Sequence, residues 1–121
     1  MQSSVVLAGA GLDLDRLAHI IAAHSDKGQA CPDLCCAILM DADVLDMIGA
    51  MSIAMHISKL DGHSAFFFHD ICQILLGREM EYCAGQRMLL NTPAAVAMLD
   101  QKQRFIGRFA AQLRRELRRT A

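Results

Sequence analysis

Apolar residues recur every three or four positions along most of the chain, which is the spacing of one face of an α-helix. In the first such stretch four residues share a face, namely Leu17, Ile20, Ile21 and His24. Asp13 precedes this stretch and is a helix-capping residue, so the pattern predicts a helix over residues 14–25. Residues 3–10 are small and apolar, and they predict the end of an earlier helix.

The centre of the chain predicts a second helical region. Asp33 is a candidate N-cap, and the helix that it starts ends at Met40 or continues through the acidic positions beyond it. A helical stripe then continues to about residue 59 and comprises Leu45, Ile48, Gly49, Ser52, Ile53 and His56. Asp61 and Gly62 form a turn signal after it.

Two further helices are predicted before residue 91. Ser64 is a candidate cap for a helix over residues 66–76. Gly77 weakens the helix at its end, and residues 78–90 resume the helical pattern.

The last helix has the clearest start signal in the chain. Thr92 is a favoured N-cap residue and Pro93 is favoured at the first helical position, so we expect a helix from there to about residue 119. Its expected buried stripe is Val96, Leu99, Phe105, Phe109 and Leu113.

Composition adds a fold class to this pattern. The chain has 121 residues, of which 54% are apolar, so it has material for one core but not for two domains. It is rich in Ala, Leu and Met and has no Trp, which favours helices over strands. We therefore predict an all-α helical bundle forming a single domain over residues 1–121.

The net charge is −1, so nucleic acid is not an expected partner. The basic run at residues 114–119 is interpreted as favourable charge at a helix C-terminus, with an RNA- or membrane-binding patch as the alternative. Polar residues interrupt the longest apolar stretches, and we see no signal peptide. We expect a cytoplasmic protein without a membrane partner.

Five cysteines are irregularly spaced, and three of them fall close together: Cys31, Cys35 and Cys36. Structural zinc usually requires a second ligand pair at comparable spacing, which the chain lacks. Core packing of these side chains is therefore preferred, and zinc is the alternative.

Three carboxylates interrupt the most apolar part of the chain. Asp41 and Asp43 are two residues apart and do not share a helix face, whereas Asp43 and Asp46 are three apart and do. A buried carboxylate is costly unless it is paired or bound to metal, and carboxylates suit Mg, Mn or Fe. The alternative is that these residues cap a helix beginning near Asp41 or Asp43.

Residues 41–50, DADVLDMIGA, are similar to the DADRLDAIGA signature of bacterial HD-domain hydrolases. The similarity continues into Met51-Ser-Ile-Ala54, and residues 17–25 resemble the family's helix ending in HS. Residues 89–92 resemble its LMNT turn, and residues 103–109 resemble the following helix. The resemblance covers nearly the whole chain and implies the C-terminal part of an HD domain.

Carried over by position, Asp43 matches the family's final metal-binding aspartate. His24 matches a histidine near the phosphate and metal pocket, where it would serve a catalytic role. Asp41 and Asp46 match flanking acidic positions, which implies that they support the ligand or cap a helix. The family's Arg positions are Val44 and Met55 here, so positive charge that could meet a phosphate is missing.

The family's earlier metal ligands, a His and a His-Asp dyad, have no counterpart before His19. His69-Asp70 follows the signature instead, where the family has an ordinary helix, so its metal-binding role is the minor alternative. The stretch Phe66-Phe-Phe-His-Asp70 is interpreted as core with a polar edge. A lone carboxylate and imidazole would hold a divalent metal (Mn, Fe, Ni or Mg) weakly or not at all.

The resemblance thus implies a truncated or degenerate metal-dependent phosphohydrolase for a phosphate ester or nucleotide, with an incomplete site. The alternative is a non-catalytic helical binding or oligomerisation module derived from an HD domain. An unrelated small helical protein is the third hypothesis. Removal of helices from a bundle exposes the faces that they covered, so we expect a homo-oligomer.

Overall fold

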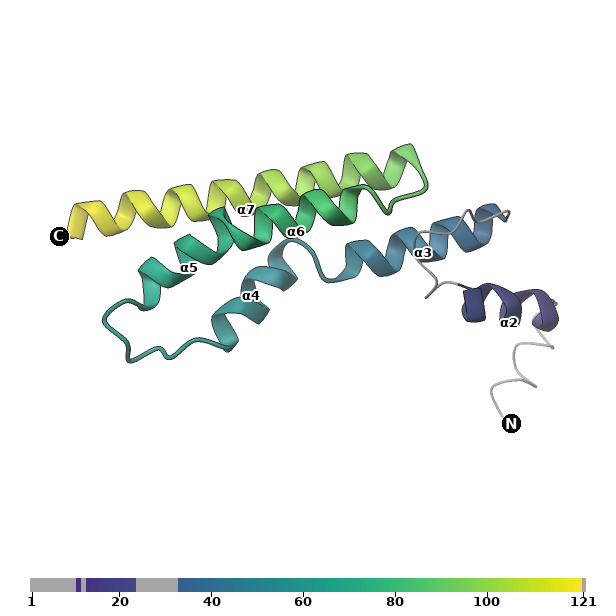
Figure 1. The fold of residues 1–121 in the computed structure, drawn as a ribbon, viewed down its shortest axis with the longest axis horizontal. Coiled ribbons are helices and arrows are strands. Elements are labelled where there is room, and N and C mark those ends of the chain that lie inside the picture. Colours follow the sequence, from purple (N-terminus) through teal and green to yellow (C-terminus); the bar gives the residue numbers. More distant parts are fainter. Residues whose placement is uncertain (1–10, 12, 24–32, 121) are drawn as a thin grey trace.

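The structure is a computed structural model that describes residue 11 and residues 13–23 and 33–120, with side chains described to residue 119 (Figure 1). Within those ranges the chain forms helices and no strands, which confirms the predicted all-α helical bundle. The helices are α2 (Leu14–Ala23), α3 (Leu34–Asp46), α4 (Ala50–Ser58), α5 (Phe67–Leu76), α6 (Arg78–Arg87) and α7 (Pro93–Thr120). The helix expected at residues 3–10 lies outside the described residues.

The long helix α7 organises the bundle. Figure 1 shows α5 and α6 following one another along α7 and running in the opposite direction. Helices α3 and α4 also follow one another, and both contact α7. Helix α2 packs on α3 at the end of the molecule away from the C-terminus. All the helices from α3 to α6 therefore meet α7.

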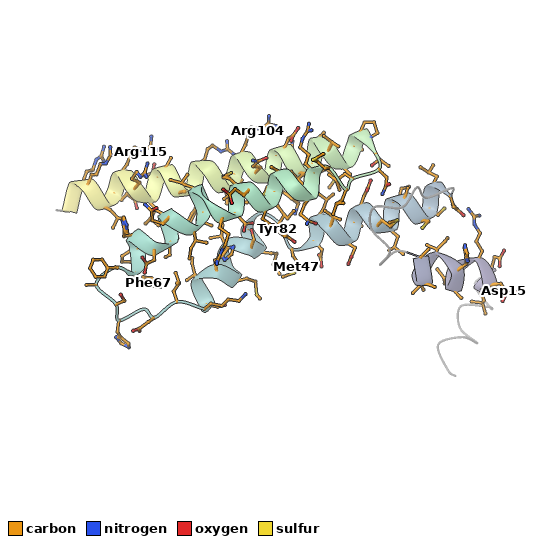
Figure 2. The ribbon with its side chains drawn as sticks, viewed as in Figure 1. Asp15, Met47, Phe67, Tyr82, Arg104 and Arg115 are labelled. Carbon is orange, nitrogen blue, oxygen red and sulfur yellow. The ribbon has the colours of Figure 1, made fainter. Side chains whose placement is uncertain are left out.

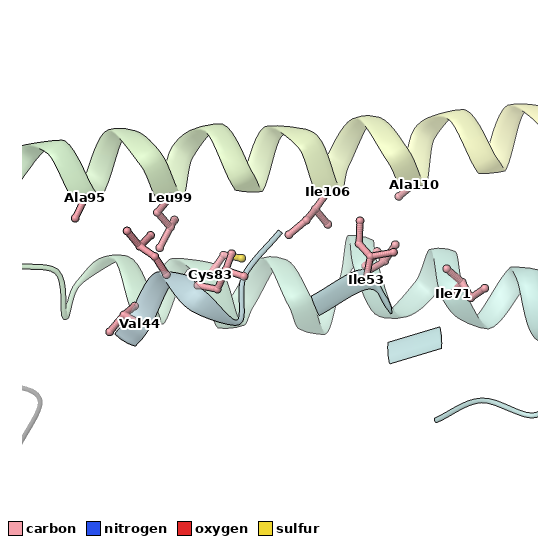
Figure 3. Packing of buried hydrophobic residues seen from close by; sticks show 11 residues of the cluster. Val44, Ile53, Ile71, Cys83, Ala95, Leu99, Ile106 and Ala110 are labelled. Carbon is pink, nitrogen blue, oxygen red and sulfur yellow. The ribbon is translucent and has the colours of Figure 1, made fainter. Parts of the chain in front are cut away.

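The core lies where these helices face α7 (Figure 3). Its largest fully buried side chains are Ile48, Leu75, Leu99, Ile106 and Cys83. Ile53 and Ile71 add a second layer from α4 and α5. Burial of such side chains away from water supplies the main driving force for the fold.

The buried face of α7 differs in part from the predicted stripe. Leu99 is fully buried as expected, but Phe105 is 41% exposed. Val96, Phe109 and Leu113 are only half-buried. The buried face is instead Ala95, Leu99, Ile106 and Ala110. Neighbouring residues point about 100° apart on a helix, so burying Ile106 turns Phe105 towards solvent.

The predicted continuous stripe from Leu45 to His56 is interrupted, because α3 ends at Asp46 and α4 begins at Ala50. Gly49 lies at the break with φ +100°, a conformation that other residues rarely adopt. Ser52 caps the start of α4, since its Oγ donates to the Gly49 carbonyl (2.8 Å) and accepts from the Gly49 N–H (3.1 Å). The two helices can therefore bend around α7.

The local start signals of α2 and α3 are confirmed. The Asp13 carboxylate accepts from the Arg16 N–H at 3.0 Å, and the Asp33 carboxylate accepts from the Cys35 N–H at 2.9 Å. The Arg16 side chain also donates two hydrogen bonds to Asp33 and so joins α2 to α3. Hydrogen bonding from Arg16 lowers the pKa of the Asp33 carboxyl.

The predicted helices around Gly77 are observed with shorter ends. Helix α5 begins one residue later than expected, and α6 ends at Arg87 instead of residue 90. Ser64 precedes α5, and its Oγ accepts from the Phe66 N–H at 3.2 Å. Phe66 and Phe68 are 67% and 51% exposed, so the interpretation of this aromatic run as core is wrong for those two rings.

Candidate functional site

Asp41 is buried in the middle of α3, with 3% of its surface exposed. Its Oδ1 accepts hydrogen bonds from the backbone N–H of Asn91 (2.7 Å) and from the Asn91 side-chain amide (3.1 Å). Its Oδ2 accepts from the backbone N–H of Thr92 (2.9 Å) and from the Thr92 hydroxyl (2.7 Å). Both carboxylate oxygens are therefore fully engaged by residues fifty positions further along the chain.

These contacts fix the start of α7. Thr92 Oγ1 accepts from the Ala95 N–H (3.3 Å), as expected of an N-cap residue, and Asp41 holds the Thr92 hydroxyl from the other side. A negative charge at a helix N-terminus is favourable, because the unpaired N–H groups there carry positive charge. Asp41 thus caps α7, not the helix in which it lies, and the expectation that these carboxylates begin their own helix is wrong.

The other two carboxylates of the segment take different positions. Asp43 is exposed on α3, on a side of the helix that Asp41 does not share. Asp46 is the last residue of α3 and is also exposed. His24 lies outside the described residues. The structure therefore does not bring Asp43, Asp46 and Asp41 to one point, and the roles carried over for Asp43 and His24 stay predictions.

A groove of about 490 Å³ runs beside the segment, between α3, the start of α4 and the first half of α7. Ile38, Met51 and Met98 are its large apolar residues, and they are 53%, 56% and 51% exposed. Its other lining residues are Asp41, Ala42, Leu45, Asp46, Thr92, Ala94, Ala95 and Lys102. The groove is thus a mainly apolar surface that also includes two acidic side chains, Asp41 and Asp46, and one basic side chain, Lys102.

Lys102 lines the groove and contacts the bend between α3 and α4. Its Nζ donates to the Ile48 carbonyl at 3.0 Å, which satisfies a backbone oxygen left free at the end of α3. A Cβ on Gly49 would lie 3.3 Å from Cγ of Lys102, so the glycine also permits this close approach. Lys102 is half-buried, and its charged end reaches the backbone of the bend.

Across the described part of the chain, no three His, Cys, Asp or Glu side chains converge as a metal-binding group, so the donor set around Asp43 does not by itself fit a metal centre. His69 is exposed on α5 and lines a cavity with Arg114 and Arg118, while Asp70 is half-buried. The predicted divalent metal stays a prediction.

The cysteines divide between core and surface. Cys72 and Cys83 are buried free thiols and agree with the core interpretation, Cys36 is buried but disulfide-bonded, Cys35 is exposed, and Cys31 lies outside the described residues. Burial raises the pKa of the Cys72 thiol. Burial and, to a smaller extent, the negative charge of Glu79 raise the pKa of Cys83 to about 11.

Sequence reasoning missed the partners of the segment. The sequence marks Thr92 as a helix start and residues 89–92 as a family-like turn, but it does not pair either with Asp41, and Lys102 carries no signal of its own. A usable signal was present, because a buried Asp in an apolar helix requires donors and a helix N-terminus offers several. The pattern could not say which of the chain's helix starts supplies them.

Comparison of the chain with protein-family models, with curated proteins and with solved structures finds no match. Across the residues that the structure describes, no helix is long and apolar enough to span a membrane.

Proposed function

We propose that this chain is a helical self-association module, in which the groove between α3, α4 and α7 receives a second copy of the chain. The observation that carries the proposal is the exposure of Ile38, Met51 and Met98 around one groove, each more than half exposed. Large apolar side chains gathered at one site usually mark an interaction surface. Methionine is suited to such a surface because its flexible, polarisable side chain adapts to the partner.

Charge favours a second copy as the occupant. The exposed Asp46 of α3 lines the groove and Asp43 is exposed on the same helix, whereas the far end of α7 carries four exposed arginines: Arg114, Arg115, Arg118 and Arg119. Figure 1 shows that α3 and the C-terminus of α7 lie towards opposite ends of the molecule. A two-fold antiparallel pair would place the basic end of one copy beside the acidic helix of the other.

The net charge of −1 supports the same choice, because two copies repel each other little at long range. The buried Asp41 network adds rigidity to the groove, since it fixes α3 to the start of α7. The signature-like segment then has a structural purpose in this chain, whatever its ancestry. Derivation from an HD domain is part of the proposal and rests on the resemblance of residues 41–50.

The experiment is sedimentation velocity at several micromolar concentrations of the wild-type chain and two variants. Met98→Glu places a charge in the groove and should convert a dimer to a monomer. Met88→Glu is the matched control, because Met88 is 87% exposed between α6 and α7 and lies outside the groove. A wild-type chain that stays monomeric, or an equal effect of both variants, would overturn the proposal.

Metal-dependent hydrolysis of a phosphate ester or nucleotide is the proposal that the resemblance alone supports. Its test is the metal content of purified wild-type chain and of Asp43→Ala, followed by a phosphatase screen across nucleotides. Stoichiometric Mn, Fe, Ni or Mg that is lost in Asp43→Ala would favour hydrolysis over a purely structural module. Equal metal content in the two proteins would count against Asp43 as a ligand.

A further inference from the structure

A second cavity lies between α4 and α6 and shares no lining residue with the groove. Its volume is about 250 Å³, slightly below the range of about 300–1,000 Å³ that is usual for drug-sized ligands. It is lined by Met47, Ser52, Met55, His56, Lys59, Arg78, Glu79 and Tyr82. Met47 and Tyr82 are labelled in Figure 2, where they lie near the middle of the molecule.

A buried acid and imidazole form the floor of this cavity. His56 Nε2 donates to Glu79 Oε2 at 2.6 Å, and the two side chains are 18% and 4% exposed. The other oxygen of the carboxylate, Oε1, is buried and has no hydrogen-bond donor among the described residues. Buried polar atoms are nearly always satisfied, so an acceptor left without a donor in a cavity wall points to a ligand.

No neighbouring described residue donates a hydrogen bond to this oxygen. Ser52 lines the cavity, but its hydroxyl hydrogen bond is given to the Gly49 carbonyl at 2.8 Å. Cys83 is buried near Glu79, whose negative charge contributes to the raised pKa of its thiol. The charge at Glu79 is therefore held in a poorly solvated place, where an additional hydrogen bond is valuable.

The rim of the cavity has the opposite charge. Lys59 at the end of α4 and Arg78 at the start of α6 are both exposed and both line the cavity. Met47 and Met55 are 43% and 41% exposed and supply apolar walls, and the ring of Tyr82 is 48% exposed. The cavity thus combines an acceptor at its floor, apolar walls, and two cations at its mouth.

We propose that this cavity binds a small organic anion that also carries a hydroxyl or amino group. The hydroxyl or amino hydrogen is donated to Oε1 of Glu79, the apolar body contacts Met47, Met55 and Tyr82, and the anionic group meets Lys59 and Arg78. The inference goes beyond the self-association module and does not depend on it, because the two surfaces have no residue in common.

The test is an NMR titration of the full chain with 4-hydroxyphenylacetate, which has a carboxylate, a ring and a hydroxyl donor. We expect saturable shifts at His56, Met55 and Tyr82. The matched probe 4-methoxyphenylacetate keeps the ring and the anion but lacks the donor, and it should bind at least about ten-fold more weakly, because Oε1 is then left unpaired. Equal affinity for the two probes, or no saturable shift at these residues, would overturn the proposal.

Two surface variants test the contact with the ligand's anionic group without disturbing the core. Lys59→Gln should weaken 4-hydroxyphenylacetate several-fold, whereas Arg108→Gln, an exposed cation on α7 outside this cavity, should leave its affinity unchanged. Equal effects of the two variants would mean that only overall charge matters and would contradict the proposed site. Because Lys59 and Arg108 are exposed, both variants are expected to fold.

Discussion

Replacement of Asp41 by alanine removes the carboxylate that joins the middle of α3 to the start of α7. Four donors lose their acceptor at once, namely the backbone and side-chain nitrogens of Asn91 and the backbone nitrogen and hydroxyl of Thr92. Asp41 is 3% exposed, so water cannot replace it without opening the contact between α3 and α7.

The magnitude follows from the kind of network that is lost. A single hydrogen bond to a charged group contributes about 1.5–3 kcal/mol, and an N-cap contributes about 0.5–2 kcal/mol. These values do not add, because the four bonds share one carboxylate. A buried donor left without an acceptor costs about 1–3 kcal/mol, and several donors are affected at once, so we expect Asp41→Ala to lower the free energy of unfolding by about 3–5 kcal/mol.

The assay is urea unfolding followed by circular dichroism at a fixed chain concentration. Asp43→Ala is the matched control, because Asp43 is two residues away on the same helix and is exposed, so we expect a smaller loss than in Asp41→Ala. Asp41→Asn keeps the shape but turns an amide nitrogen towards a donor, and it should lose an intermediate amount. A loss below about 1 kcal/mol in Asp41→Ala would refute the capping role.

Three further predictions concern the backbone, the core and the buried thiols. Gly49→Ala should lower the free energy of unfolding by about 1–2 kcal/mol, because φ is +100° and the Lys102 side chain is close. Gly85→Ala on α6 should raise it by about 0.5–1 kcal/mol, because a Cβ there would meet no atom within 4 Å. Urea unfolding measures both changes. Leu99→Ala should cost about 2–5 kcal/mol and Phe105→Ala under about 1 kcal/mol in the same assay, since Leu99 is fully buried and Phe105 is exposed. The pKa of Cys83 is raised to about 11, so its contribution to stability is fully present below the unfolded thiol pKa of about 8.5 and is lost as pH rises towards 11. Unfolding measured from pH 7 to 11 should show this decline, and Cys83→Ala should show less of it.

Much of the helical framework follows from local signals. Asp13, Asp33 and the Thr92-Pro93 pair mark helix starts because a cap acts within one turn of the chain. The all-α class also follows from local information, namely the composition and the spacing of apolar residues. Such features need no knowledge of distant residues.

The bend at Gly49 was not predictable in this way, because apolar residues keep helical spacing across it. The break is visible only as a positive φ and as the approach of Lys102 from α7. The choice between Phe105 and Ile106 has a similar cause. A 28-residue helix offers two overlapping apolar stripes, and contacts from α5 and α6 decide which one is buried.

At the two sites, too, local signals are visible in the sequence whereas contacts between distant residues are not. The sequence identified Asp41 as unusual, since a carboxylate in an apolar helix requires compensation. Its donors lie fifty positions away, so only the folded chain brings them together. The pair His56 and Glu79 was missed because each residue, taken alone, is an ordinary polar position on its own helix.

The measurement that tests the proposed self-association most directly is the NMR spectrum of the methionine methyl groups as the chain is diluted. The methionines of the described residues report separately on the groove, the core and the remaining surface. We predict that the methyl signals of Met51 and Met98 move with concentration while that of Met88 stays in place. Signals that are all independent of concentration, or a change confined to Met88, would contradict a second copy seated in the groove.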